Sequence, residues 1–208
     1  MAGGKRAAKA AATRARMLGA ARALFVGGGY GSTSMQAIAA EAGVAVQTLY
    51  YTFETKRAIL TELLDVEVAG DAAPVATLDR PQVMEAMAAP PADQLRRMVA
   101  MTAQVHARVV PLLEVLRAAA AVDPGVADLW RTNIAQRHTV QVAFAAALAA
   151  KGALRPGLSA GRAADIALAV LSPETYHLLV HERAWPRADW ADWATDALTR
   201  QLIAEIDG

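Results

Sequence analysis

The sequence predicts an all-α protein in which a three-helix amino-terminal helix-turn-helix domain precedes a larger helical domain. Hydrophobic residues make up 55% of the 208 residues and aromatic residues only 5%. Ala, Leu and Val therefore supply most of the apolar surface, and Ala and Leu favour helices. Apolar residues also recur every three or four positions through most of the chain, which is the spacing of one helical face. No segment alternates apolar and polar residues as a half-buried strand would.

Basic residues are concentrated near the start of the chain. The first 60 residues hold eight Lys and Arg side chains but two acidic ones, whereas the whole chain has a net charge of +1. This division suggests that the amino-terminal segment binds a polyanion. The chain has no cysteine, which excludes disulfides and cysteine nucleophiles, and no signal peptide is evident. We therefore expect a cytoplasmic protein with no membrane partner.

Turn and capping residues divide the first 70 residues into four helices. Residues 14–25 form an amphipathic helix that a run of glycines ends. Thr33 and Gln36 match the T-x-x-Q capping box that begins a second helix. A third, short helix is predicted from about Ala45 to Phe53, and Thr55 can cap the fourth.

Longer helical patterns follow a proline-rich stretch from Gly70 to Pro91. That stretch predicts a linker containing one short helix. Pro111 is expected to kink or split the first long helix, because proline lacks the N–H that a helix interior requires. Ser159 begins a later helix, and Ser172 interrupts or restarts it.

Residues Gly29 to Leu60 read GYGSTSMQAIAAEAGVAVQTLYYTFETKRAIL, and the short helices here form a helix-turn-helix arrangement. This stretch resembles the DNA-binding domain of the TetR family of bacterial transcriptional regulators. The run from Leu171 to Trp190 is also similar to the end of many such regulators. The resemblance implies a DNA-binding domain over residues 1–57, with 1–10 as a disordered basic arm. Residues 58–208 would then form a ligand-binding and dimerisation domain.

The resemblance also implies a mode of action. A homodimer would place its two third helices in successive major grooves of a palindromic operator on double-stranded DNA. A small-molecule effector bound in the larger domain would spread the two helices and release the DNA. The protein is thus expected to be a ligand-responsive regulator, more often a repressor than an activator, with no catalytic activity and no cofactor.

DNA-contacting residues follow from the resemblance by position. The implied phosphate contacts are Thr33, Ser34, Tyr50 and Lys56, and the implied groove contacts are Gln36, Val46, Gln47, Thr48 and Thr52. A glutamine can pair with adenine, and a valine or threonine methyl can meet a thymine methyl. The capping box gives Gln36 an equally good role within the protein. Tyr51 is expected to pack rather than to contact DNA.

Three positions depart from the family pattern. Ala45 stands where the family often has a serine that caps the third helix, so that helix is expected to fray more readily. Gln36 replaces a frequent arginine, and Thr52 replaces a frequent aromatic residue or histidine. Base preference therefore cannot be taken over from a relative.

Candidate effector contacts lie on the helices that would surround a family pocket. They are Met98, Met101, His106, Trp130, Asn133, Arg137, Phe144, Tyr176 and His177. Each of these residues is also accounted for by ordinary core packing. The last helix and the helix from Ser159 are expected to form a four-helix interface with their partner copies.

A metal-dependent helical-bundle enzyme is the alternative function. His177 and His181 are four residues apart, and Glu174-x-x-His177 matches half of a di-iron motif. A second Glu-x-x-His is missing from the sequence, so no metal ligand is assigned.

Overall fold

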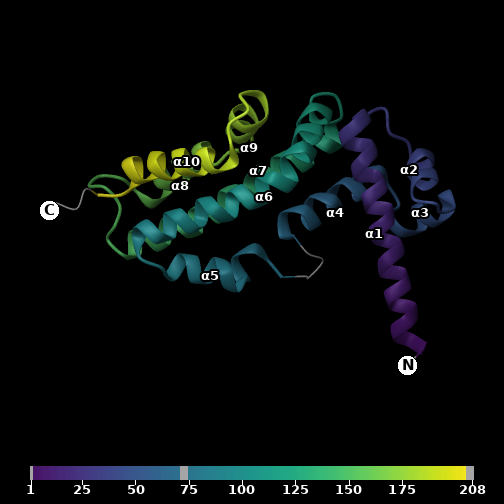
Figure 1. The fold of residues 1–208 in the computed structure, drawn as a ribbon, viewed down its shortest axis with the longest axis horizontal. Coiled ribbons are helices and arrows are strands. Elements are labelled where there is room, and N and C mark those ends of the chain that lie inside the picture. The colour runs from purple at the N-terminus through teal and green to yellow at the C-terminus, as the bar shows by residue number, and fades with distance from the viewer. Residues whose placement is uncertain (1, 71–74, 205–208) are drawn as a thin grey trace. The chain divides into compact units, whose positions relative to one another are not determined.

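The computed structural model describes residues 2–70 and 75–204, and its helices confirm the all-α class (Figure 1). In these ranges the only β-type pairing is an isolated antiparallel bridge between Leu154 and Ile203. The chain divides into two compact units, each described below by itself. Among the described residues, unit 1 holds 2–68 and 111–131, and unit 2 holds 69–70, 75–110 and 132–204.

Unit 1 contains the helix-turn-helix. It is built from α1 (Ala2–Gly28), α2 (Met35–Glu41), α3 (Val46–Phe53) and nearly all of α4 (Lys56–Ala69), with the end of α6 (Pro91–Ala120) and the start of α7 (Pro124–Ala150). Helix α1 packs on α2, and α2 packs on α3 (Figure 1). Phe25, Ile38, Leu49 and Ile59 are fully buried, so all four amino-terminal helices contribute to this core.

The first helix extends further toward the amino terminus than the sequence analysis indicated. It begins at Ala2, so the segment 1–10 is not a disordered arm over the part that the structure describes. Five alanines lie between residues 7 and 12, and alanine has the highest helix propensity. The helix propensity of these alanines thus outweighs the positive charge of the segment.

The predicted T-x-x-Q capping box at the start of α2 is wrong by one residue. Ser34 is the N-cap, and its Oγ accepts a hydrogen bond from the Ala37 N–H at 3.0 Å. Gln36 is therefore the second residue of α2 and does not close a box with Thr33. Its side chain is exposed and remains available for other contacts.

Pro111 does not split its helix, since α6 runs unbroken from Pro91 to Ala120. A proline in a helix interior costs a hydrogen bond and introduces a steric conflict. The neighbouring Val110 and Leu112 are fully buried, and their packing offsets that cost. A continuous α6 matters here because the helix contributes to both units.

Unit 2 contains most of α6 and α7 and the remaining helices. These are the 3₁₀-helix η1 (Thr77–Asp79), α5 (Pro81–Ala88), α8 (Ala160–Val170), α9 (Pro173–Tyr176), the π-helix η2 (His177–Glu182) and α10 (Arg187–Leu202). Helix α8 packs beside α10 (Figure 1). Ser159 and Ser172 are N-caps as predicted, and the short helix expected in the proline-rich stretch is α5. The π-helix was not predicted.

The boundary between the compact units differs from the predicted domain boundary at residues 57 and 58. Most of α4 belongs to unit 1, because Leu60, Leu63 and Leu64 are buried there. The turn between α6 and α7 also belongs to unit 1. The amino-terminal helices thus have a larger supporting core than three short helices alone would provide.

Candidate nucleic-acid interface

Helix α3 is held by its inward side chains. Leu49 is fully buried and Phe53 nearly so, one turn apart on the same face. Gly43, with φ of +63°, makes the turn between α2 and α3, and glycine adopts this conformation without steric cost. At the start of α3, the N-cap Ala45 makes no side-chain hydrogen bond, as its sequence position predicted. Packing therefore fixes α3 more than capping does.

The residues of α3 that are predicted to contact DNA differ in their exposure. Gln47 and Thr48 are exposed and Tyr50 is 45% exposed, whereas Val46 and Thr52 are half-buried. The Thr52 hydroxyl donates to the Thr48 carbonyl at 2.7 Å, which leaves its methyl group as the outward part. The DNA contacts predicted for these residues stay predictions.

Tyr51 was wrongly expected to pack. It is 93% exposed, and its ring stacks on no other aromatic ring among the described residues. Tyrosine is amphipathic, so its position in the sequence did not reveal whether its ring faces inward. The structure adds it to the exposed face of α3.

Helix α1 and α3 together line an open groove with a volume of about 630 Å³. Arg6, Lys9 and Thr13 lie on the α1 side, and Thr48 and Tyr51 lie on the α3 side. The basic side chains of α1 therefore adjoin the exposed face of α3. Such a juxtaposition combines phosphate attraction with groups that can reach base edges.

The two residues before α2 differ in their availability. Ser34 is exposed, and as an N-cap it lies at a helix amino terminus, where free N–H groups attract phosphate. Thr33 is only 6% exposed, and its hydroxyl donates to the Gly29 carbonyl at 2.8 Å. Thr33 therefore ties the end of α1 to the following turn. This position corrects the prediction that the Thr33 hydroxyl binds phosphate.

Lys56 is directed largely into the protein. Its Nζ donates to the carbonyls of Tyr30 at 2.6 Å and Thr33 at 2.8 Å, and it lies 4.2 Å from the centre of the Tyr30 ring. Burial lowers the pKa of Lys56, and the carboxylate of Asp123 acts in the opposite direction. An ammonium has three donors, so these carbonyls leave one for a phosphate. The predicted DNA contact stays a prediction.

Ion pairs join α1 to α4. The Arg14 guanidinium pairs bidentately with Glu62, and its Cζ lies 4.6 Å from the centre of the Phe53 ring. Further along the same two helices, Arg22 Nε donates to a Glu67 carboxylate oxygen at 2.8 Å. Bidentate arginine–carboxylate pairs fix geometry as well as charge. These two ion pairs therefore hold the basic helix α1 against α4.

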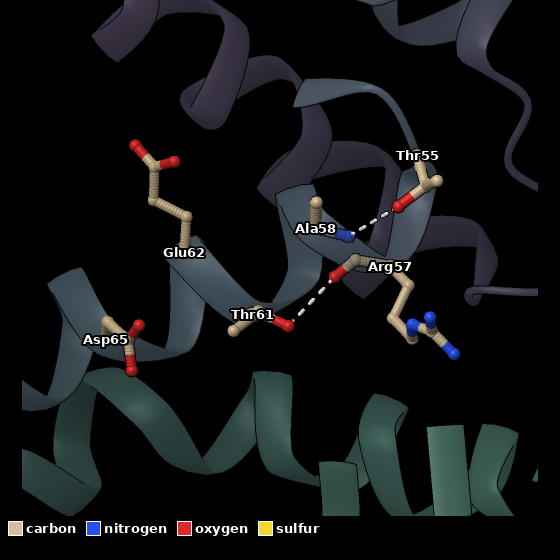
Figure 2. Close-up of a pocket in the computed structure, with 6 residues that line it drawn as sticks. All are labelled: Thr55, Arg57, Ala58, Thr61, Glu62 and Asp65. Atoms are coloured by element: carbon tan, nitrogen blue, oxygen red, sulfur yellow. Dashed lines mark hydrogen bonds between the residues drawn. The ribbon is translucent and has the colours of Figure 1, made fainter. Parts of the chain in front are cut away.

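A second hollow lies over α4, as Figure 2 shows. Glu62 and Asp65 project at one end and Arg57 at the other, and Thr55 caps the helix by accepting from the Ala58 N–H at 3.1 Å. Burial, and then the neighbouring Glu62, raise the pKa of Asp65. Carboxylates at this end repel phosphate, so this hollow is less suited to DNA than the groove between α1 and α3.

The predicted effector residues do not all fall in one unit. Trp130 belongs to unit 1, and the other eight belong to unit 2. Met98, Phe144 and Tyr176 are buried in a single apolar cluster, and Met101 packs against it. In this conformation they form a packed core. Whether any of them contacts an effector stays a prediction.

The polar members of the set make specific contacts. Asn133 is buried and its Oδ1 accepts from Arg137 Nε at 3.1 Å, and Arg137 also pairs with Glu174 at 3.8 Å. Burial lowers the pKa of Arg137, which Glu174 partly offsets. His106 is 4% exposed, and its Nε2 lies 3.0 Å from the Leu171 carbonyl oxygen.

His177 lies on the π-helix η2, where the sequence had suggested a possible metal site. Its Nε2 is 3.2 Å from a Glu182 oxygen, and its ring centre is 5.4 Å from that of His181. Over residues 2–70 and 75–204, no group of three or more His, Cys, Asp or Glu side chains could hold a metal ion. The contacts of His177 are therefore those of a partly exposed polar residue.

By length and composition, α6 is apolar enough to cross a membrane, with 44% of its most apolar 18-residue window buried in the protein. Leu95, Val110 and Leu116 of this helix are fully buried. A core helix meets the same criterion.

Residues 17–63 match the family model described as bacterial regulatory proteins, tetR family. The matched segment runs from the buried part of α1 through the helix-turn-helix into α4. This segment is therefore similar to the DNA-binding domain of the TetR family. The fold class expected from the resemblance is thereby confirmed. No curated protein matches the sequence at a significant level.

Solved structures share the fold of this chain over nearly its whole length. NalD, the secondary repressor of the MexAB-OprM multidrug efflux pump in Pseudomonas aeruginosa, is 20% identical, with 96% of this chain and 100% of that chain covered and a TM-score of 0.70. A SmeT–triclosan complex is 18% identical, with 94% and 93% covered and a TM-score of 0.71. A transcriptional regulator from Saccharomonospora viridis in complex with choline is 20% identical, with 93% and 98% covered and a TM-score of 0.68. These matches are to regulators, and they give no support to the alternative of a metal-dependent enzyme.

Proposed function

We propose that this protein is a cytoplasmic, ligand-responsive repressor that binds a palindromic operator as a homodimer and is released by a small molecule. The exposed face of α3, beside the basic side chains of α1 in one groove, is the observation that carries this proposal. The similarity to the TetR family supports it. NalD is a repressor, and the SmeT and S. viridis structures hold different small molecules.

In this proposal Gln47, Thr48 and the Thr52 methyl face the bases, and Ser34, Tyr50 and one Lys56 donor meet phosphates. Gln36 is free of a capping role, so we include it among the groove contacts. Tyr51 joins this set because of its exposure. A well-placed base contact contributes about 1 to 3 kcal/mol of discrimination.

The turn between α6 and α7 provides a route from effector to DNA. Asp123 caps α7 by accepting from the Gly125 N–H at 2.9 Å and the Val126 N–H at 3.2 Å. A Cβ atom added at Gly125 would overlap the guanidinium of Arg57 at the start of α4. Helices α6 and α7 are continuous with their segments in unit 2. A shift of those segments on effector binding would therefore act on α4 and, through it, on α3.

The test is selection of genomic DNA fragments by the purified full-length protein. We expect a small set of fragments sharing an inverted repeat. The Gln47→Ala variant should bind that sequence about tenfold or more weakly, whereas Gln82→Ala, an exposed glutamine on α5, should bind as the wild type does. Recovery of fragments with no shared sequence by a correctly folded protein would contradict the proposal.

Salt dependence tests the role of α1. Lys9 lines the groove beside α3, and a lysine that contacts phosphate displaces one counterion from the DNA. Lys9→Ala should therefore lower the slope of log affinity against log salt by about 1. Arg96→Ala, a surface arginine of unit 2, is the matched charge control and should leave the slope unchanged.

A further inference from the structure

Three aromatic rings from different helices meet in the interior of unit 2. They are His106 of α6, Tyr176 of α9 and Trp190 of α10, which are 4%, 1% and 0% exposed. Tyr176 meets the other two edge-on, with ring centres 5.3 Å from His106 and 5.0 Å from Trp190. The centres of the His106 and Trp190 rings are 5.8 Å apart. We call this group the ring cluster.

Two nitrogens of the ring cluster have no hydrogen-bond partner among the described residues, namely His106 Nδ1 and Trp190 Nε1. The contact of His106 Nε2 with the Leu171 carbonyl oxygen fixes the proton on Nε2, because a carbonyl only accepts. His106 Nδ1 is then an acceptor, whereas the Trp190 N–H is a donor. Buried polar atoms in native proteins nearly always have a partner, so this pair indicates a missing group that both accepts and donates.

The surroundings of the ring cluster favour a neutral, largely apolar ligand. Met98 and Phe144 belong to the same buried apolar cluster as Tyr176 and Trp190. Burial lowers the pKa of His106 to about 4, so its ring is neutral at pH 7. The nearby charge of Arg137 is balanced by Glu174 at 3.8 Å.

We propose that the ring cluster binds the hydroxyl group of a small aromatic alcohol, whose oxygen accepts from Trp190 Nε1 and donates to His106 Nδ1. This inference rests on the proposed function, in which unit 2 holds the effector. Flexible methionine side chains such as Met98 would let the packed core open to admit the ring of the ligand.

Phenol and toluene test the proposal, since they have similar size and differ in the hydroxyl group. Binding to the full-length protein is measured by calorimetry without DNA. We expect phenol to bind about tenfold or more tightly than toluene, because toluene leaves both nitrogens unpaired. A purely apolar site would prefer toluene. Equal affinities, a preference for toluene, or no phenol binding because an internal water holds the site would each overturn the proposal.

Substitution locates the binding site. His106→Phe removes the acceptor and should abolish the preference for phenol, and Trp190→Phe removes the donor and should reduce it. His138→Phe, at a half-exposed histidine of α7, is the control and should keep the wild-type preference. A preference that survives His106→Phe would place the phenol elsewhere and overturn the proposal.

Nuclear magnetic resonance of the wild type avoids any folding defect of the variants. Phenol should shift the indole N–H signal of Trp190, and toluene should shift it much less. An unmoved signal at saturating phenol would overturn the inference. The DNA-selection experiment is scored separately: operator binding with release by another class of compound would retain the proposed function and reject the ring-cluster site.

Discussion

In unit 1 the Lys56 ammonium donates to two backbone carbonyls, and Arg14 and Arg22 each pair with a glutamate of α4. In unit 2 the buried ring nitrogens of His106 and Trp190 have no partner among the described residues. Both units thus bond most polar groups within their own chain, as Asn133 of unit 2 also shows, but two buried ring nitrogens of unit 2 are left without a partner among the described residues.

This difference matches the separate functions proposed for the two units, DNA binding and effector binding. A DNA-reading surface must present its side chains in a fixed geometry, and the internal bonds of unit 1 hold α1, α3 and α4 together. A ligand shifts a conformational equilibrium only if it binds one conformation more tightly than the other. Buried polar atoms without a partner provide such a difference, because the ligand can form hydrogen bonds with them. The following predictions test each side of the comparison.

The largest stability effect is expected at Lys56. Lys56→Met retains the aliphatic chain but leaves the carbonyls of Tyr30 and Thr33 without their donor. We expect a loss of about 1 to 3 kcal/mol in the free energy of unfolding, measured by urea denaturation. Lys9→Met is the matched control on an exposed lysine and should change stability little. Equal effects of the two substitutions would show that unit 1 is not held as described.

His106 should make stability depend on pH. Its pKa is lowered to about 4 in the folded protein, so protons bind the unfolded state first as the pH falls below about 6.5. The folded state should therefore lose about 2 kcal/mol between pH 7 and pH 5 from this group. His106→Gln should remove this part of the pH dependence, as measured by urea denaturation at both pH values. An unchanged pH dependence would contradict the buried, neutral histidine.

A smaller gain is expected at the start of α3. Ala45 is the N-cap but provides no side-chain acceptor, so Ala45→Ser should stabilise the protein by about 0.5 to 1 kcal/mol. Thermal unfolding followed by circular dichroism would measure this gain. Destabilisation would mean that α3 does not begin where the structure places it.

Sequence patterns predicted the helix-turn-helix because its signals are local. The apolar spacing around Leu49 and the turn at Gly43 act within a few residues, and the caps at Thr55, Ser159 and Ser172 do the same. Errors arose where two local signals competed. Ser34 rather than Thr33 caps α2 because the Thr33 hydroxyl bonds to the end of α1, a contact that spacing alone does not reveal.

Features that depend on distant packing were less accessible from the sequence. Tyr51 is exposed, and Lys56 points inward because Tyr30 and Thr33 are brought to it by α1 and the following turn. Nothing local in the sequence indicates that Trp190 meets His106. The candidate DNA surface was therefore predicted in outline, whereas the ring cluster required the structure.

Operator binding by Thr48→Asp tests the central claim most directly, namely that the outward face of α3 lies against DNA. Thr48 is exposed, so the substitution should leave thermal unfolding nearly unchanged. A carboxylate placed against base edges and phosphates should weaken binding to the selected operator by about 100-fold or more. Wild-type affinity in a correctly folded Thr48→Asp protein would contradict this account.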